Sequence, residues 1–150
     1  MPQTSLKSDL QIKVDYNTSN EDQKAIRTGI VAFNEKFIHE TAKSFAVLLK
    51  DKHNQVYGGI LAWLHSESVY IDVLWVEESV RHHQHGTKLL LAAENEARKK
   101  GCIYSTVDTF SFQAEPFYLK NGYQRLGEIK NYLFQHSKIF LRKDLRRQMS

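Results

Sequence analysis

The chain has 150 residues, of which 41% are hydrophobic and 25% are charged, and its formal net charge is +4. This length allows one packed core and is too short for two comfortable domains, so we expect a single domain over residues 1–150. Cys102 is the only cysteine, which excludes an intramolecular disulfide, and no apolar run approaches the roughly 20 residues that a membrane-spanning helix needs. Residues 1–10 lack the apolar core of a signal peptide, so we expect a cytoplasmic protein with no membrane partner.

The first half of the chain predicts one helix among several strands. Residues 11–16 alternate polar and apolar side chains, which is the period-two pattern of a strand. Ser19 or Asn20 then offers a helix N-cap, and the acidic residues that follow favour the positive end of the helix dipole. Apolar residues recur at helical spacing as far as about Glu40, where we expect this helix to end. Three further strands are predicted over residues 45–50, 56–65 and 68–76.

The second half of the chain predicts helices between strands. Residues 87–100 carry apolar side chains at helical spacing, and Gly101 fits the position that ends a helix. We then expect a strand over 102–110, a short helix entered near Pro116, a strand over 123–129 and a final extended segment over 131–145. This mixture indicates an α+β domain with a mixed sheet flanked by helices.

The segment RHHQHG, residues 81–86, joins the strongest predicted strand to a helix N-terminus. Such a junction suits an anion, because the first N–H groups of a helix have no intrahelical partner and the helix dipole places partial positive charge there. Arg81 adds a permanent charge, Gly86 permits close backbone approach and Thr87 offers a hydroxyl group. We therefore expect residues 81–87 to bind phosphate or a similar anion.

Three histidines in this segment, His82, His83 and His85, raise the alternative of a metal site, because imidazole is a common metal ligand. A structural zinc site has four ligands in a tetrahedral array. The sequence offers no second cysteine and no partner cluster of His or carboxylate residues at a suggestive spacing. We expect exposed loop histidines beside an anion, and no metal.

Two motifs, in the correct order and spacing, resemble those of a known family. RHHQHG is similar to a loop of Gln or Arg, two residues, Gly, one residue, then Gly or Ala; it matches at Arg81 and Gly86 and has Gln84 where glycine is usual. FYLKNGY, residues 117–123, matches a later motif of an aromatic-Tyr pair followed by x-Lys-x-Gly and an aromatic residue. Over roughly residues 45–145 the chain thus resembles the GCN5-related N-acetyltransferase (GNAT) superfamily, in a compact bacterial-type single-domain form.

The resemblance implies a GNAT-like fold, with a mixed, mostly antiparallel central sheet flanked by helices, and acetyl-CoA as the acetyl donor. Its pyrophosphate would lie against the loop, and its pantetheine arm would pair with main-chain groups at the end of the central strand. Gln84 stands where glycine is usual and costs roughly 1 kcal/mol if its position needs a positive φ, and His82 also replaces a frequent family glycine. The implied cofactor-binding residues are Leu74, Val76, Arg81, His82, His83, Gln84, His85, Gly86 and Thr87.

The reaction that the resemblance implies is direct attack of a primary amine, on a small molecule or a protein, on the thioester carbon. Tyr118 matches the tyrosine that commonly protonates the departing thiolate, and a phenol is protonated at neutral pH; packing is its alternative role. Asp72 is the candidate base, placed by period two on the face of Leu74 and Val76. The alternatives left open for the base are Glu67, Glu115 and water.

A competing function is a catalytically weak or inactive GNAT-like module that keeps CoA as a sensor, or that has lost CoA and contacts a nucleic acid or a protein. Gln84 and His82 support it, and Ser111 stands where many members have a CoA-contacting Asn. The basic stretch over residues 138–147 is too small to indicate a nucleic-acid partner. The sequence leaves a homodimer open.

Overall fold

The computed structural model describes residues 9–40 and 42–146, which belong to two compact units, Met1–His39 and Glu40–Ser150. Most of the start of the chain, where we expect no signal peptide, and Arg147 of the basic stretch lie outside the described residues. Among the described residues, no helix is long and apolar enough to cross a membrane.

The first unit contains the helix α2 (Asn20–Asn34). Its start agrees with the predicted N-cap, since the Ser19 hydroxyl accepts a hydrogen bond from the backbone N–H of Asp22 at 3.1 Å. The helix ends before the predicted limit near Glu40. The prediction of a strand over residues 11–16 is wrong, because the structure shows no strand there. An alternating pattern forms a strand only where a neighbouring strand satisfies its backbone N–H and C=O groups.

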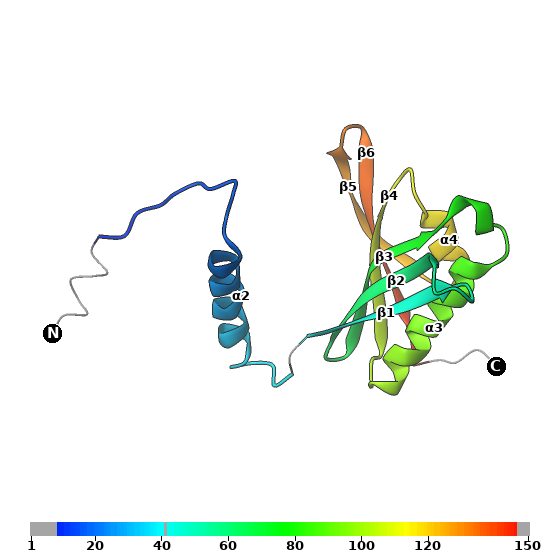
Figure 1. Cartoon of the computed structure of the whole chain (residues 1–150), viewed down its shortest axis with the longest axis horizontal. Helices are drawn as coiled ribbons and strands as arrows, with labels where there is room; N and C mark the ends of the chain where they lie inside the picture. Colours follow the sequence, from blue (N-terminus) through cyan, green and yellow to red (C-terminus); the bar gives the residue numbers. More distant parts are fainter. Residues whose placement is uncertain (1–8, 41, 147–150) are drawn as a thin grey trace. The chain divides into compact units, whose positions relative to one another are not determined.

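The second unit is built on a sheet of six strands, which are β1 (Lys43–Lys50), β2 (Val56–His65), β3 (Ser68–Val76), β4 (Tyr104–Phe110), β5 (Gln124–Leu133) and β6 (His136–Asp144). Their order across the sheet is β1-β2-β3-β4-β6-β5 (Figure 1). All neighbours are antiparallel except β3 and β4, which run parallel. The predicted α+β fold with a mixed, mostly antiparallel sheet is confirmed.

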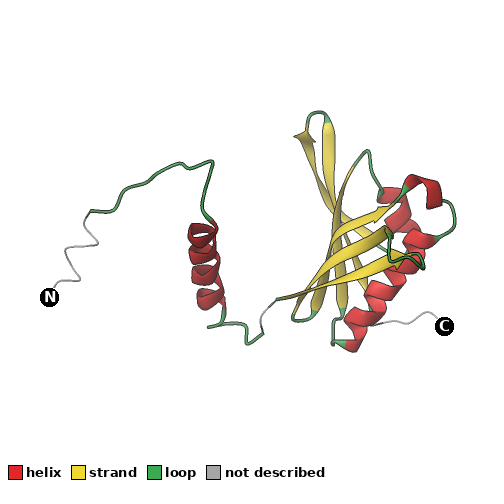
Figure 2. Cartoon of the chain, in the orientation of Figure 1, coloured by secondary structure: helices red, strands yellow, loops and turns green. Residues whose placement is uncertain are grey.

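Two helices, α3 (His85–Lys99) and α4 (Glu115–Lys120), lie on one side of this sheet (Figure 2). α3 packs on β1, β2 and β3. Its buried face faces the sheet and meets Ile60, Val69 and Ile71, so the core lies between α3 and one sheet face. A short 3-10 helix, η1 (Glu78–Val80), leads from β3 toward the start of α3.

The end of the chain differs from the prediction of a single extended segment over residues 131–145. β5 and β6 instead form a hairpin that turns at residues 134–135 (Figure 1). Phe134 in this turn and Asn131 near the end of β5 adopt the left-handed conformation, with φ of 56° and 54°. The turn contains neither Gly nor Pro, so the strongest sequence signal for a turn is missing.

β3 and β4 pair over only part of their length, from Ser68 opposite Tyr104 to Ile71 opposite Val107. Beyond that point β3 continues to Val76 and β4 to Phe110, and the structure shows no pairing between these ends in the part of the chain that it describes. The strands therefore diverge, and the edge of β3 that faces β4 has no ladder partner among residues 9–40 and 42–146. This opening positions the candidate site.

Candidate active site

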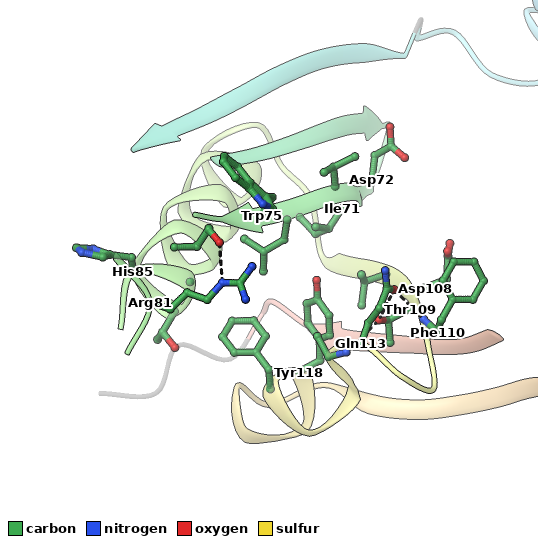
Figure 3. Close-up of a pocket in the computed structure, with 18 of the residues that line it drawn as sticks. Ile71, Asp72, Trp75, Arg81, His85, Asp108, Thr109, Phe110, Gln113 and Tyr118 are labelled. Carbon is green, nitrogen blue, oxygen red and sulfur yellow. Dashed lines mark hydrogen bonds between the residues drawn. The ribbon is translucent and has the colours of Figure 1, made fainter. Parts of the chain in front are cut away.

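A cavity of about 860 Å³ opens where β3 and β4 diverge. Its walls are the ends of these two strands, the loop before α3, the first turn of α3, and α4 with the loop that precedes it. Figure 3 shows Arg81 toward one end and Asp108 toward the other, with Tyr118 between them. The structure brings together all of the predicted site residues except His83, which does not line this cavity.

The loop before α3 passes through two non-glycine residues in the left-handed conformation. His82 has a φ of 69° and Gln84 a φ of 62°. A side chain in this conformation costs roughly 1 kcal/mol per residue, so the strain anticipated for Gln84 is present at both positions. The loop is tied to the end of β3, because Arg81 Nε donates a hydrogen bond to the Val76 carbonyl at 2.8 Å (Figure 3).

The first turn of α3 offers hydrogen-bond donors to the cavity. His85, Gly86 and Thr87 line it, and their backbone N–H groups have no acceptor among residues 9–40 and 42–146. Gly86 also has a packing role, since a Cβ at this position would lie 3.4 Å from Cε1 of Phe117. The missing side chain therefore lets the Phe117 ring of α4 pack against the start of α3.

Tyr118 is the buried tyrosine of α4, with 4% of its surface exposed. Its ring packs edge-on against Phe117 and Tyr123, at centroid distances of 5.2 and 5.5 Å. The hydroxyl points into the cavity (Figure 3) and makes no hydrogen bond to another described residue. Burial, and then the charge of Asp108, raises the pKa of Tyr118 to about 12. The residue thus packs the core and keeps a proton at the cavity wall.

Gln113 orders the loop that leads into α4, a role that the sequence did not reveal. Its side-chain oxygen accepts hydrogen bonds from the Thr109 hydroxyl at 3.1 Å and from the Phe110 backbone N–H at 3.0 Å. The Thr109 hydroxyl oxygen in turn accepts the backbone N–H of Ala114 at 3.3 Å. These bonds set where α4 begins and so help to position Tyr118. A Thr and a Gln four residues apart are too common to signal this arrangement.

Asp72 lines the cavity, but its placement differs from the prediction. A register shift between β2 and β3 makes Asp72 an extra residue on β3, which is a β-bulge. The bulge interrupts the period-two alternation, so Leu74 and Val76 pack against the core whereas Asp72 is exposed. The prediction that these three side chains share a face is therefore wrong.

Asp108 is a second carboxylate in the cavity, and no pattern in the sequence singles it out. It lies on β4 at the point where β4 leaves β3. The Tyr70 hydroxyl donates a hydrogen bond to Asp108 Oδ2 at 2.7 Å, and Lys138 Nζ lies 3.8 Å from Oδ1. Burial, and then the hydrogen bond to Asp108, raises the pKa of Tyr70, so Tyr70 remains a donor. Tyr70, Asp108 and Lys138 come from three different strands, so no local sequence pattern predicts that their side chains lie together.

The sequence model of the Acetyltransferase (GNAT) family matches residues 10–123. The chain belongs to this family. Acetyltransferase Atu2258 of Agrobacterium fabrum is 32% identical over 110 residues, which cover 73% of this chain and 80% of the relative. Blasticidin-S acetyltransferase of Streptomyces morookaense is 33% identical over 89 residues, which cover 59% of this chain and 65% of the relative. The crystal structure of an acetyltransferase from Bacillus cereus superimposes with a TM-score of 0.76 at 30% identity, covering 88% of this chain and 97% of that one.

As a GNAT member, the protein is an acetyltransferase, and acetyl-CoA is the acetyl donor of this family. The cavity fits such a donor on its own geometry. It combines backbone N–H donors at a helix N-terminus, which suit phosphate oxygens, with an edge of β3 that no described strand pairs with, which suits an extended arm that contains amide groups.

The two other carboxylates considered as the GNAT base do not line the cavity. Glu115 accepts two hydrogen bonds from Arg125, at 2.6 and 2.9 Å, and the backbone carbonyl of Glu67 accepts the N–H of Ile103 at 2.7 Å. Ser111 is also outside the lining, and it joins the loop after β4 to the β5–β6 hairpin. Its hydroxyl accepts the Ser137 backbone N–H at 3.0 Å, and its own N–H donates to the Ser137 carbonyl at 2.9 Å.

Two of the three loop histidines, His83 and His85, lie beside one another. The rings of His83 and His85 are 6.0 Å apart. Across the described residues, no group of three or more His, Cys, Asp or Glu residues is arranged to hold a metal ion. The prediction of metal-free loop histidines stays a prediction until metal is analysed in solution.

Proposed function

We propose that this acetyltransferase moves an acetyl group from acetyl-CoA to a primary amine of a small molecule by direct attack. The observation that carries the proposal is the cavity between the diverging strands, which gathers a helix N-terminus, an unpaired strand edge, a protonated phenol and carboxylates around one space. The identity of 33% with blasticidin-S acetyltransferase supports a small-molecule acceptor. A protein amine is the alternative acceptor.

The residues suited to hold the donor lie at the end of the cavity that contains Arg81. The backbone N–H groups of residues 85–87 and the Arg81 guanidinium would bind the pyrophosphate, because both supply positive charge and hydrogen-bond donors. Main-chain groups of Leu74 and Val76 on the open edge of β3 would pair with the pantetheine arm. The Val76 carbonyl already accepts Arg81 Nε, which leaves its second lone pair for the arm. Bound acetyl-CoA supplies an acetyl group activated as a thioester.

Side chains of the cavity accept a proton from the acceptor amine and donate one to the leaving sulfur. The acceptor ammonium is not a nucleophile, so it first loses a proton to Asp72, or to water, and its nitrogen then attacks the acetyl carbon. Tyr118 donates its hydroxyl proton to the sulfur, which keeps the electron pair as the carbon–sulfur bond breaks. The nitrogen, which carries two protons after the attack, then gives one of them to the Tyr118 phenolate, and this restores the Tyr118 hydroxyl. The complete transfer releases one proton to solvent.

The test combines binding with product identification. Calorimetric titration with acetyl-CoA comes first, followed by thiol-release assays over blasticidin S, aminoglycosides, polyamines, amino acids and peptides. We expect saturable acetyl-CoA binding and acceptor-dependent thiol release, with an N-acetylated product in mass spectrometry. Binding without release on any amine would contradict the proposal and favour a catalytically inactive CoA-binding module.

A further inference from the structure

We propose that Asp108 binds the ammonium group of the acceptor, and that the aromatic rings beside it select an acceptor whose amine is carried by a flat, unsaturated ring system. The inference rests on the proposed function and names the acceptor class of the same cavity. Asp108 lies at the point where β4 separates from β3, and the side chains of Asp108 and Tyr118 line the same cavity (Figure 3). It is therefore placed near the group that we assign to the leaving sulfur.

The Asp108 carboxylate is held in place while keeping capacity for a ligand. Tyr70 donates to Oδ2 at 2.7 Å, whereas Lys138 Nζ is 3.8 Å from Oδ1, which is too far for a hydrogen bond. An ionised carboxylate has about four lone-pair positions, so Oδ1 can accept an N–H of an ammonium group. The side chain is only 24% exposed, and partial exclusion of water strengthens such an ion pair.

An aromatic wall continues from Asp108 along the loop after β4. Phe110 stacks on Phe112 at 5.5 Å with an interplanar angle of 9°, and on Tyr132 at 6.0 Å. His136 meets Phe112 edge-on at 4.6 Å. Phe110 and Phe112 line the cavity, and Phe112 is 54% exposed. An exposed ring face beside a carboxylate suits a ligand that stacks a flat ring and places a cation close by.

This wall is joined across two segments of the chain. Phe110 and Phe112 belong to β4 and the following loop, and Tyr132 and His136 belong to the β5–β6 hairpin. The two hydrogen bonds between Ser111 and Ser137 hold these segments together. The rings are therefore arranged before any ligand arrives, which lowers the entropy lost on binding.

The charge of Asp108 also distinguishes the substrate from the product. The acceptor ammonium is cationic, whereas the acetylated nitrogen is an uncharged amide. The carboxylate consequently binds the substrate more tightly than the product, and product release follows from the loss of charge. A neutral residue at this position would give neither the preference nor the release.

The test measures dissociation constants of small probes by NMR titration of the full chain in the presence of CoA, which carries no acetyl group. Wild-type protein should bind 2-phenylethylamine at least tenfold more tightly than 2-phenylethanol, as expected for about one hydrogen bond to a charged group. Asp108→Asn should reduce this ratio to below about threefold, and Asp108→Glu should restore part of it. Glu128→Gln removes one negative charge outside the cavity lining and should leave the ratio unchanged. The preference for a flat ring is tested with 2-cyclohexylethylamine, which should bind more weakly than 2-phenylethylamine. Phe112→Leu should remove that difference.

Each outcome separates this inference from the proposed function. An ammonium preference that is absent from the wild type, or that survives in Asp108→Asn, would overturn the role of Asp108. If Asp108→Asn does not fold, Tyr70→Phe keeps the carboxylate, removes its hydrogen bond and should weaken the preference; an unchanged preference would overturn the positioning. A preference that depends on Asp108, without acetyl transfer to any amine, would contradict the proposed function and leave this acceptor site standing.

Discussion

Replacing Gly86 by valine should weaken acetyl-CoA binding at least tenfold. Gly86 lies in the first turn of α3, and a Cβ there would lie 3.4 and 3.5 Å from two carbons of the Phe117 ring. A single methyl group therefore already reaches van der Waals contact. The two γ-methyl groups of valine extend further, so they either displace Phe117 or project toward the N–H groups that we assign to the pyrophosphate.

The structure sets the size of the effect. Overpacking of this kind typically costs 1–3 kcal/mol, and a tenfold loss of affinity corresponds to about 1.4 kcal/mol. Displacing Phe117 would also disturb Tyr118, because their ring centroids are 5.2 Å apart. We therefore expect Gly86→Val to lower turnover as well as affinity.

Calorimetric titration with acetyl-CoA measures the affinity, and thermal unfolding checks that each variant is folded. Gly86→Ala adds only the Cβ and should keep the dissociation constant within about threefold of wild type. Gly127→Val places the same side chain on β5, where no atom of the described residues lies within 4 Å of a new Cβ, and should leave acetyl-CoA binding unchanged. An unchanged dissociation constant in Gly86→Val would refute the placement of the pyrophosphate at the start of α3.

Three further predictions concern metal content, stability and pH. Metal analysis of untagged protein, dialysed without chelator, should find no stoichiometric zinc; zinc that is lost in His83→Ala and His85→Ala would show that the loop histidines form a metal site. Lys143→Met should lower the free energy of unfolding in urea by about 3 kcal/mol, because it leaves the fully buried Glu94 carboxylate without the ammonium that lies 2.8 Å from it; a loss well under 1 kcal/mol would contradict this. The pKa of Tyr118 is about 12 in the folded protein and about 10 in the unfolded chain, so the unfolded chain loses the phenol proton at a lower pH. The stability that Tyr118 contributes is therefore complete below pH 10 and is lost as the pH rises toward 12. Between pH 9 and pH 11 the wild type should therefore lose about 1 kcal/mol more stability than Tyr118→Phe in urea unfolding, and equal losses would argue against the raised pKa.

The strands and helices around the site could be predicted because their signals are local. β2 and β3 have the predicted bounds, and each consists largely of residues that favour strands. The loop over residues 81–87 was recognisable from its charge, its glycine and its place before a helix. Gln84 and His82 adopt the left-handed conformation, which explains why glycine is frequent at these two positions in the GNAT loop motif.

The remaining features depend on contacts between distant segments. The bulge at Asp72 arises from the register between β2 and β3, which the alternation within one strand does not contain. Asp108 becomes a candidate only when Tyr70 from β3 and Lys138 from β6 are placed beside it. The strand predicted over residues 11–16 failed for the same reason, since a sheet requires a partner that a single segment cannot specify.

The rate of acetyl transfer by Tyr118→Phe tests the central claim most directly. The substitution removes one hydroxyl group and almost no volume, so the packing of the ring against Phe117 and Tyr123 is kept. General acid catalysis by one side chain typically contributes 10²–10⁴-fold, so single-turnover acetylation of a competent amine should slow by about that factor, while the dissociation constant of acetyl-CoA changes by less than about threefold. Full turnover in the variant, under conditions where chemistry limits the rate, would contradict the account and leave Tyr118 as a packing residue.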